Sequence, residues 1–199
     1  MMDVDLATNS FGQNLNVTMT QMVATFASLI NGGYYYQPHV VKQILSESGE
    51  PVKTINPTLV TQTVSSDTSH TMREMMRAVV DYGTGGYVHM DGYSIGGKTG
   101  TAEKAGRDKT EYVISFMGFA PAENPEVLVY VVIDTPDCEE YNTSWSAQVL
   151  ARAMKFRATG GHPAKRTFQS GISHNCPGKY VGSVALGIYG EFYIVESSY

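Results

Sequence analysis

Three strand-like segments follow one another in the middle of the chain, and this succession limits the fold more than any other feature. They are residues 93–102, 112–119 and 127–133, of which the second alternates in polarity and the third is almost continuously apolar. The stretch from Pro121 to Pro125, between the last two, has the length and composition of a hairpin turn. The sequence therefore predicts an antiparallel sheet.

Helical segments flank these strands. Residues 18–31 carry apolar side chains at helical spacing and begin at a capping box formed by Thr18 and Gln21. A second helix is predicted from residue 66 or 67 to residue 83, and a third over residues 143–156. The predicted apolar face of the second helix consists of Met72, Met75, Met76, Val79 and Val80.

The remaining segments are less regular. Residues 34–45 are rich in aromatic and β-branched side chains and predict one strand, with residues 51–55 returning beside it. The glycine-rich residues 83–86 predict a flexible loop. After residue 156 the periodicity stops, so we predict two parts: residues 1–156, and a tail of residues 157–199 to which no function is assigned. Within this tail, residues 181–195 have room for one or two strands, although glycines interrupt them.

The composition excludes several classes of function. The 199 residues are 42% hydrophobic and 17% charged, which is typical of a globular protein. The formal net charge is -5 and no basic cluster occurs, which argues against nucleic-acid binding. Cys138, Cys176 and the five histidines lack metal-ligand spacing, so we expect neither a metal nor a cofactor. We also expect no signal peptide and no transmembrane segment in this chain.

The stretch Gly92-Tyr-Ser-Ile-Gly-Gly-Lys-Thr-Gly-Thr-Ala-Glu103 satisfies two motifs that demand different structures. Gly92–Thr99 matches the phosphate-binding loop of nucleotide hydrolases, which needs a buried strand before it and a helix beginning at the lysine. Residues 87–91 make a poor buried strand, and each glycine after the lysine costs a helix about 1 kcal/mol relative to Ala. The apolar residues 128–134 end in an aspartate that a magnesium site would need, which favours this interpretation only weakly. A nucleotide hydrolase remains the less favoured alternative.

The centre of the same stretch is K-T-G, the third signature of the serine enzymes that react with penicillin. That motif needs a strand at a sheet edge, where Gly96, Gly97 and Gly100 let a ligand backbone approach closely. Side-chain alternation places Lys98 and Thr99 on opposite faces. Both therefore serve one site only if the edge of the strand, and not one face, borders the cleft.

The chain resembles the class B penicillin-binding proteins, which are peptidoglycan D,D-transpeptidases, and within them the sporulation and division branch of Gram-positive bacteria. The resemblance covers residues 3–156 and rests on several stretches in the family's order. These are Asp5-Leu-Ala-Thr-Asn-Ser-Phe-Gly-Gln13, Ile30-Asn-Gly-Gly33, Pro38-His-Val-Val41, Val79-Val-Asp-Tyr-Gly-Thr-Gly85, Gly96-Gly-Lys-Thr-Gly-Thr-Ala-Glu103 and Ser115-Phe-Met-Gly-Phe-Ala-Pro121.

The resemblance implies an α+β fold of the β-lactamase and transpeptidase type, in which helices flank an antiparallel sheet. It implies two-step acyl transfer from D-Ala-D-Ala stem peptides, which β-lactams imitate. Lys98 then has a catalytic role, because it supplies positive charge near the substrate carboxylate and near the serine that shuttles the proton, and Thr99 hydrogen-bonds that carboxylate. The backbone N–H of Thr101 is an oxyanion-hole donor. Gly97 and Gly100 complete the strand along which the peptide lies.

The chain departs from the family in its catalytic motifs. The family's nucleophile is the serine of S-x-x-K, and no serine here has a lysine three residues later. Ser173-His-Asn175 has the letters of S-x-N but lies in the tail, and we interpret it as coincidence. We therefore expect the C-terminal half of a transpeptidase domain, inactive alone, whose missing motifs and membrane anchor precede residue 1 in family order.

The resemblance also implies location and partners. The location is the extracytoplasmic face of the cell membrane. The partners are stem peptides, β-lactams, the N-terminal half of the domain and other cell-wall synthesis proteins. A non-catalytic fragment of the same fold remains an alternative.

Overall fold

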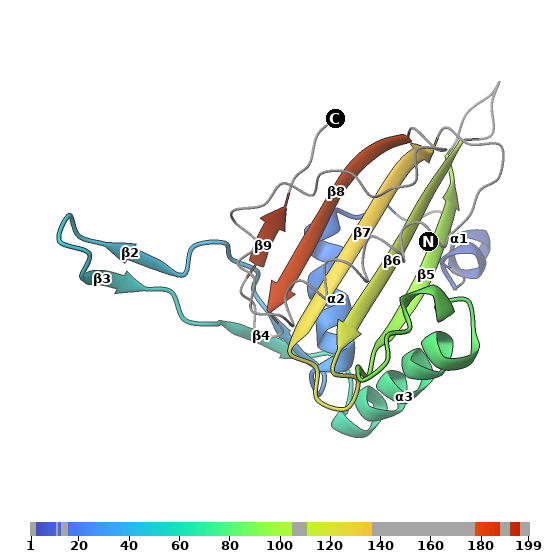
Figure 1. The fold of residues 1–199 in the computed structure, drawn as a ribbon, viewed down its shortest axis with the longest axis horizontal. Coiled ribbons are helices and arrows are strands. Elements are labelled where there is room, and N and C mark those ends of the chain that lie inside the picture. The colour runs from blue at the N-terminus through green and yellow to red at the C-terminus, as the bar shows by residue number, and fades with distance from the viewer. Residues whose placement is uncertain are drawn as a thin grey trace.

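The computed structural model describes residues 3–10, 12, 16–104, 111–136, 178–187 and 192–195, with residues 136, 178–187 and 192–195 described by their backbone alone. At the centre lies a five-stranded antiparallel sheet in the order β5-β6-β7-β8-β9 (Figure 1). Its strands are β5 (Gly96–Glu103), β6 (Tyr112–Ala120), β7 (Val127–Pro136), β8 (Gly178–Gly187) and β9 (Phe192–Val195). The predicted antiparallel sheet and the hairpin between β6 and β7 are confirmed, although β5 begins three residues later than predicted.

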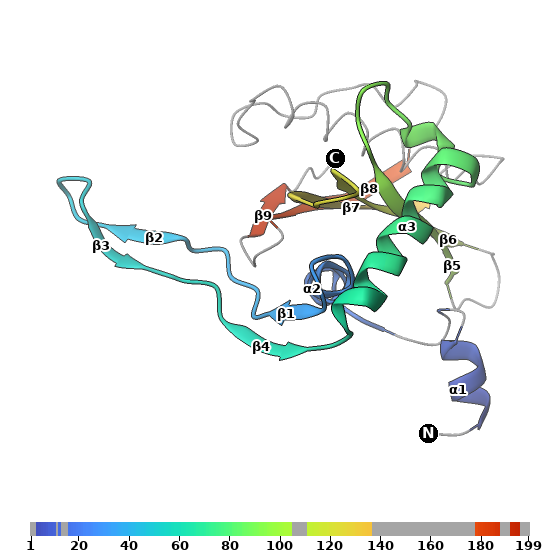
Figure 2. The ribbon, with the colours of Figure 1, turned by 90° about the horizontal axis from the view of Figure 1, so that it is seen from below.

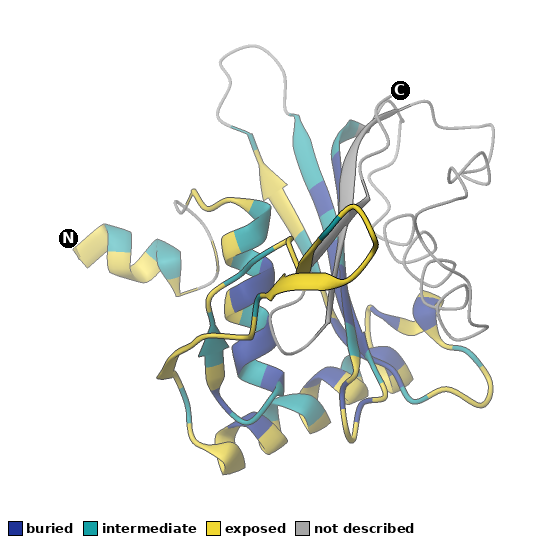
Figure 3. Cartoon of the chain, turned by 90° about the vertical axis from the view of Figure 1, so that its left-hand side faces the viewer, coloured by how far each residue is buried: buried dark blue, intermediate teal, exposed yellow. Residues whose placement is uncertain are grey.

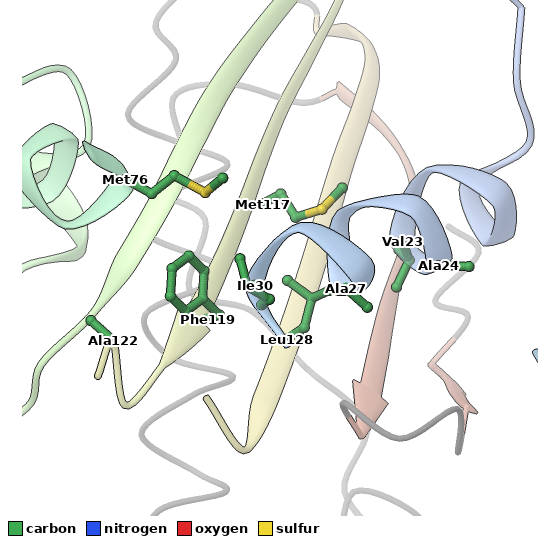
Figure 4. Close-up of a cluster of buried hydrophobic side chains, with 9 residues drawn as sticks. All are labelled: Val23, Ala24, Ala27, Ile30, Met76, Met117, Phe119, Ala122 and Leu128. Carbon is green, nitrogen blue, oxygen red and sulfur yellow. The ribbon is translucent and has the colours of Figure 1, made fainter. Parts of the chain in front are cut away.

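Helix α2 (Met19–Ile30) covers one face of this sheet (Figure 2). The predicted capping box is confirmed, because the Thr18 N–H donates to Gln21 Oε1 at 2.9 Å and the Gln21 N–H donates to Thr18 Oγ1 at 3.2 Å. Apolar residues of α2 pack with those of β6 and β7 (Figure 4). This first cluster contains Val23, Ala24, Ala27, Ile30, Met76, Met117, Phe119, Ala122 and Leu128.

Helix α3 (Ser66–Tyr82) lies alongside the β5 edge of the sheet (Figures 1 and 2). Met76 belongs to the first cluster, whereas Val80, one turn later, belongs to a second one. The second cluster contains Val80, Val88, Ile95, Phe116, Val129 and Val131. Phe116 and Phe119 of β6 belong to different clusters because successive strand residues point to opposite faces. The predicted apolar face of α3 is wrong at Met75, which is 60% exposed.

Two buried serines connect the helices. The Gly32 N–H after α2 donates to Ser69 Oγ of α3 at 2.9 Å. The Thr63 hydroxyl donates to Ser28 Oγ at 3.0 Å. Because each buried hydroxyl has a partner, neither leaves an unsatisfied polar group in the core.

The predicted single strand over residues 34–45 is wrong. Strand β1 (Tyr34–Tyr36) pairs with β4 (Leu59–Gln62), and β2 (Gln43–Leu45) pairs separately with β3 (Pro51–Thr54). Pro38 lies between β1 and β2 and has no N–H to continue a ladder.

The segment from residue 37 to residue 58, which contains β2 and β3, projects from the body of the protein, and we call it the arm (Figures 1 and 2). The return at β3 agrees with the prediction for residues 51–55. Strand β4 and the short helix α1 (Asp3–Asn9) had no counterpart in the sequence analysis.

The C-terminal segment takes part in the central sheet. Strand β8 pairs with β7, and β9 pairs with β8, in agreement with strands predicted near residues 181–195. The predicted helix over residues 143–156 lies outside the described residues. The boundary near residue 156 stays a prediction.

Candidate functional site

Strand β5 carries the K-T-G residues and forms one border of the central sheet. Among the described residues it pairs only with β6, and we call its other side, where no described strand is paired, the open edge. A helix beginning at Lys98, which the phosphate-binding loop requires, is absent, because Lys98 is the third residue of an eight-residue strand. The nucleotide hydrolase alternative is therefore wrong.

The directions of the backbone groups on β5 follow from its register with β6. The Lys104 N–H, directly after β5, donates to the Glu111 carbonyl at 2.7 Å. The register is unbroken along the whole of β5, and in an antiparallel ladder hydrogen-bonded pairs alternate with pairs that are not hydrogen-bonded. Gly97, Thr99 and Thr101 consequently direct their N–H and C=O groups away from β6, toward the open edge.

Lys98 brings its positive charge to this edge. The residue pairs with Met117 and so projects on the face that α2 covers, yet its side chain is exposed. Its Nζ atom donates to the Thr99 carbonyl at 2.8 Å, which brings the ammonium to the strand border. Within the described part of the chain, no carboxylate forms an ion pair with this ammonium. The charge therefore remains available to an anionic ligand.

Thr99 projects on the opposite face and contacts a residue from another part of the fold. Its Oγ1 lies 3.1 Å from Oγ1 of Thr84, which follows α3. Sequence analysis included Thr84 in the family-like stretch from Val79 to Gly85 but assigned it no role, because residues 83–86 otherwise gave only the signal of a flexible loop. The structure instead has a hydrogen-bonded turn there, in which the N–H groups of Gly83 and Gly85 both donate to the Val79 carbonyl.

The glycines at the start of β5 are required by the core. A Cβ atom on Gly96 would lie 2.4 Å from the Phe119 ring, and one on Gly97 would lie 2.7 Å from both the Met117 carbonyl and the Phe116 ring. Both glycines are buried. Their absence of a side chain therefore lets β6 aromatic rings pack against β5, a role that the sequence analysis did not assign to them.

A network of polar side chains holds the segment that leads into β5. Arg77 of α3 forms an ion pair with Glu123 in the β6–β7 turn, and the Ser94 hydroxyl donates to the same carboxylate at 2.8 Å. The pKa of Glu123 lies below its ordinary value, first because the carboxylate accepts its own backbone N–H and second because it accepts from Ser94. The Ala122 N–H also donates to the Ser94 carbonyl at 3.0 Å. These contacts connect α3, the β6–β7 turn and the segment before β5.

A second ionic contact lies at the far end of β5. Lys104 Nζ lies 2.7 Å from Asp134 Oδ1 of β7 and 3.1 Å from the Thr135 hydroxyl. The hydrogen bond to Asp134 is the main reason why the pKa of Lys104 is raised. This contact spans β6, so both ends of β5 are tied to other elements.

The structure therefore brings Lys98, Thr99 and Thr101 to one open strand edge, the arrangement that the K-T-G interpretation demands. Thr101 is exposed and directs its N–H outward, while Gly100 lies opposite Ser115. The roles of Lys98, Thr99, Thr101, Gly97 and Gly100 in ligand binding stay predictions.

Comparison with known proteins finds a matching family. A family model described as "Penicillin binding protein transpeptidase domain" matches residues 2–155. Stage V sporulation protein D of Bacillus subtilis is 39% identical over 137 residues, which cover 67% of this chain and 21% of that protein. The peptidoglycan D,D-transpeptidase FtsI homolog of Mesostigma viride is 31% identical over 150 residues, which cover 67% of this chain and 25% of that protein. The chain thus spans only about a fifth to a quarter of these relatives.

A solved structure has the same fold. Penicillin-binding protein 2X from Streptococcus thermophilus superposes with a TM-score of 0.65 at 26% sequence identity, over 80% of this chain and 26% of that one.

Proposed function

Since the chain belongs to the penicillin-binding protein transpeptidase family, we propose that the open edge of β5 binds the D-Ala-D-Ala end of peptidoglycan stem peptides. β-Lactams, which imitate that end, bind at the same place. The proposed role is in peptidoglycan cross-linking by acyl transfer. The observation that carries the proposal is the meeting of the Lys98 ammonium, the Thr99 hydroxyl and outward backbone N–H groups at one edge.

In this proposal each group has a separate task. The Lys98 ammonium and the Thr99 hydroxyl bind the terminal carboxylate, because a charge-assisted hydrogen bond is stronger than a neutral one. The peptide backbone adds to β5 as a further strand from Thr99 onward, using the outward groups of Thr101. The Thr101 N–H donates to the oxyanion that forms at the attacked carbonyl, and losing such a donor costs about 3 kcal/mol of barrier. Gly100 lies between the carboxylate contact at Thr99 and the oxyanion contact at Thr101, and it has no side chain that could obstruct the ligand.

The nucleophile comes from elsewhere. Acyl transfer of this type needs an activated serine, and this chain has no serine followed by lysine three residues later. We propose that the segment with S-x-x-K, which forms the N-terminal half of the domain in the family, completes the site opposite β5. Other cell-wall synthesis proteins are proposed partners of the assembled domain.

The absence of S-x-x-K from this sequence also favours a second candidate function. The chain then binds D-Ala-D-Ala ends or β-lactams at the same strand edge without reacting with them. The two candidates share the binding site and differ only in whether an acyl-enzyme forms.

The proposed location is the extracytoplasmic face of the cell membrane, where the substrate of this family occurs. Among the helices of the described residues, none has the length and apolarity to cross a membrane.

Binding is tested by titrating the ¹⁵N-labelled chain with N-acetyl-D-Ala-D-Ala and following the backbone amide signals. The expected result is a saturable shift of the Thr99 and Thr101 signals that Lys98→Met weakens. N-acetyl-L-Ala-L-Ala is the matched control, because it has the same charge and composition but the opposite chirality. Equal shifts with both peptides, or no shift at β5, would contradict the proposal.

The two candidates are separated by mass spectrometry after incubation with a fluorescent penicillin. The chain alone is expected to keep its mass. A mass increase equal to the penicillin would show that a nucleophile exists in this chain and would overturn the inference that it lies elsewhere.

A further inference from the structure

The hydroxyl groups of Thr84 and Thr99 form a contact that the proposed carboxylate site does not by itself explain. Their Oγ1 atoms lie 3.1 Å apart, and 15 residues separate them in sequence. Thr84 is exposed and Thr99 is partly exposed. An exposed hydrogen bond between two hydroxyls adds little to stability, because water offers both groups equivalent partners.

The turn that carries Thr84 is fixed on both sides. The Gly83 and Gly85 N–H groups donate to the Val79 carbonyl at 3.1 Å and 2.9 Å. A Cβ atom on Gly83 would lie 2.9 Å from that same oxygen, so the turn closes over the end of α3 only because a glycine stands there. Val80 before the turn and Val88 after it are buried in the second cluster. Thr84 is therefore held in place beside β5.

We infer that Thr84 is a positioning residue of the carboxylate site, where its hydroxyl orients the Thr99 hydroxyl as a hydrogen-bond donor toward an anionic ligand. The inference rests on the proposed function, because it names a further residue that serves the same site.

The direction of the hydrogen bonds follows from the number of protons. A hydroxyl carries one proton, and a carboxylate accepts but does not donate. When Thr99 donates its proton to the carboxylate, its oxygen becomes the acceptor for Thr84, so the chain runs from Thr84 to Thr99 to the ligand. Successive hydrogen bonds in one direction polarise one another, which makes Thr99 a stronger donor. The Lys98 ammonium adds charge at the same edge but cannot orient the Thr99 hydroxyl, since it contacts the Thr99 carbonyl.

The test uses the full chain and compares N-acetyl-D-Ala-D-Ala with its C-terminal amide. Thr84→Val removes the hydroxyl at nearly constant volume, and Thr84→Ser restores it. Thr84→Val is expected to weaken binding of the acid by about three- to tenfold, which corresponds to the contribution of about one hydrogen bond. Binding of the amide should remain unchanged, and Thr84→Ser should bind the acid within about twofold of the original chain.

A second measurement does not depend on ligand binding. Three-bond couplings report the χ1 angle of Thr99, which is expected to be one rotamer in the original chain and in Thr84→Ser. In Thr84→Val the couplings should average over several rotamers. Thr84→Ala replaces the valine variant if valine disturbs the turn, which the unfolding midpoint reveals.

The possible outcomes separate the two ideas. If Thr99→Val weakens binding of the acid but Thr84→Val does not, the role of Thr84 is wrong and the proposed function stands. If Thr84→Val weakens the acid and the amide equally, Thr84 has only a structural role and the inference is also wrong. If the original chain binds the acid no better than the amide, the carboxylate site itself is wrong and the inference falls with it.

Discussion

The strands of the central sheet and the strands of the arm are built from the same kinds of residues, yet they lie in opposite environments. In β6, Phe116 and Phe119 are completely buried. In the arm, Ile44 of β2 and Val52 of β3 are 49% and 68% exposed. Figure 3 shows the same contrast between the dark blue segments of β6 and β7 and the mostly yellow arm.

The difference teaches that strand pairing and strand burial are separate properties. The strands of the arm pair with each other, but no helix of the described residues packs on them, and an isolated two-stranded hairpin is only marginally stable in water. The strands β5, β6 and β7 pair with one another; β6 and β7 also pack against α2 and α3, and β5 lies against α3. The candidate site lies on the packed sheet, where packing fixes the positions of the backbone groups that a ligand would meet.

The largest expected effect comes from truncating one large apolar residue in each region. Phe119→Ala should lower the free energy of unfolding by about 3–5 kcal/mol, because it leaves a cavity among α2, β6 and β7. Ile44→Ala in the arm is the control and should change it by no more than about 0.5 kcal/mol, since little packing is lost. Urea unfolding followed by circular dichroism measures both. Similar losses at the two positions would show that the arm is packed in solution and would break the comparison.

A smaller loss of stability is expected when a tightly packed glycine, rather than one with free space around it, is replaced by alanine. Gly97→Ala should destabilise the fold by about 1–3 kcal/mol, because the new methyl group meets the backbone and a ring of β6. Gly86→Ala is the matched control, since the nearest atom to its added Cβ is 3.8 Å away. Thermal unfolding compares the two variants. If Gly97→Ala is as stable as Gly86→Ala, β5 does not pack tightly on β6 and the site lacks its rigid base.

The smallest expected effect is on how the free energy of unfolding depends on pH. It tests the polar network of Arg77, Glu123 and Ser94, which holds the segment before β5. The pKa of Glu123 is lowered in the folded state, so the unfolded state binds more protons between the folded and the ordinary values of that pKa. The contribution of Glu123 to stability is therefore present above its ordinary pKa of 4.5 and is lost as the pH falls through the lower folded value.

Glu123→Gln should remove this contribution and reduce the fall in stability below about pH 4.5, by a small amount because the carboxylate is exposed. Glu50→Gln in the arm controls for the loss of one negative charge. Chemical unfolding at several pH values measures the two curves. Parallel curves for both variants would show that the contact with Ser94 and Arg77 does not form in solution.

Part of the candidate site was predictable because it is local in sequence. Lys98, Thr99 and Thr101 stand within four residues, and the glycines beside them predict a strand rather than a helix. Thr84 was not predictable, because its contact with Thr99 depends on how the turn after α3 lies against β5. Gly96 and Gly97 are also required because the Phe119 and Phe116 rings pack against them. This requirement could not be predicted from the sequence, because it depends on β6 lying beside β5.

The sequence by itself determined the elements: the capped helix before Asn31, the helix from Ser66 to Tyr82, and the hairpin of β6 and β7. Their signals are periodicity, capping residues and turn residues, all of which act over a few positions. Only the tertiary structure decided that residues 34–45 divide between two sheets, that β8 and β9 extend the central sheet, and that no described strand pairs with the outer edge of β5. These features depend on which distant segments pair and pack. The alternation of apolar and polar residues predicts which face of a strand is buried, but it does not predict which distant segment packs on that face.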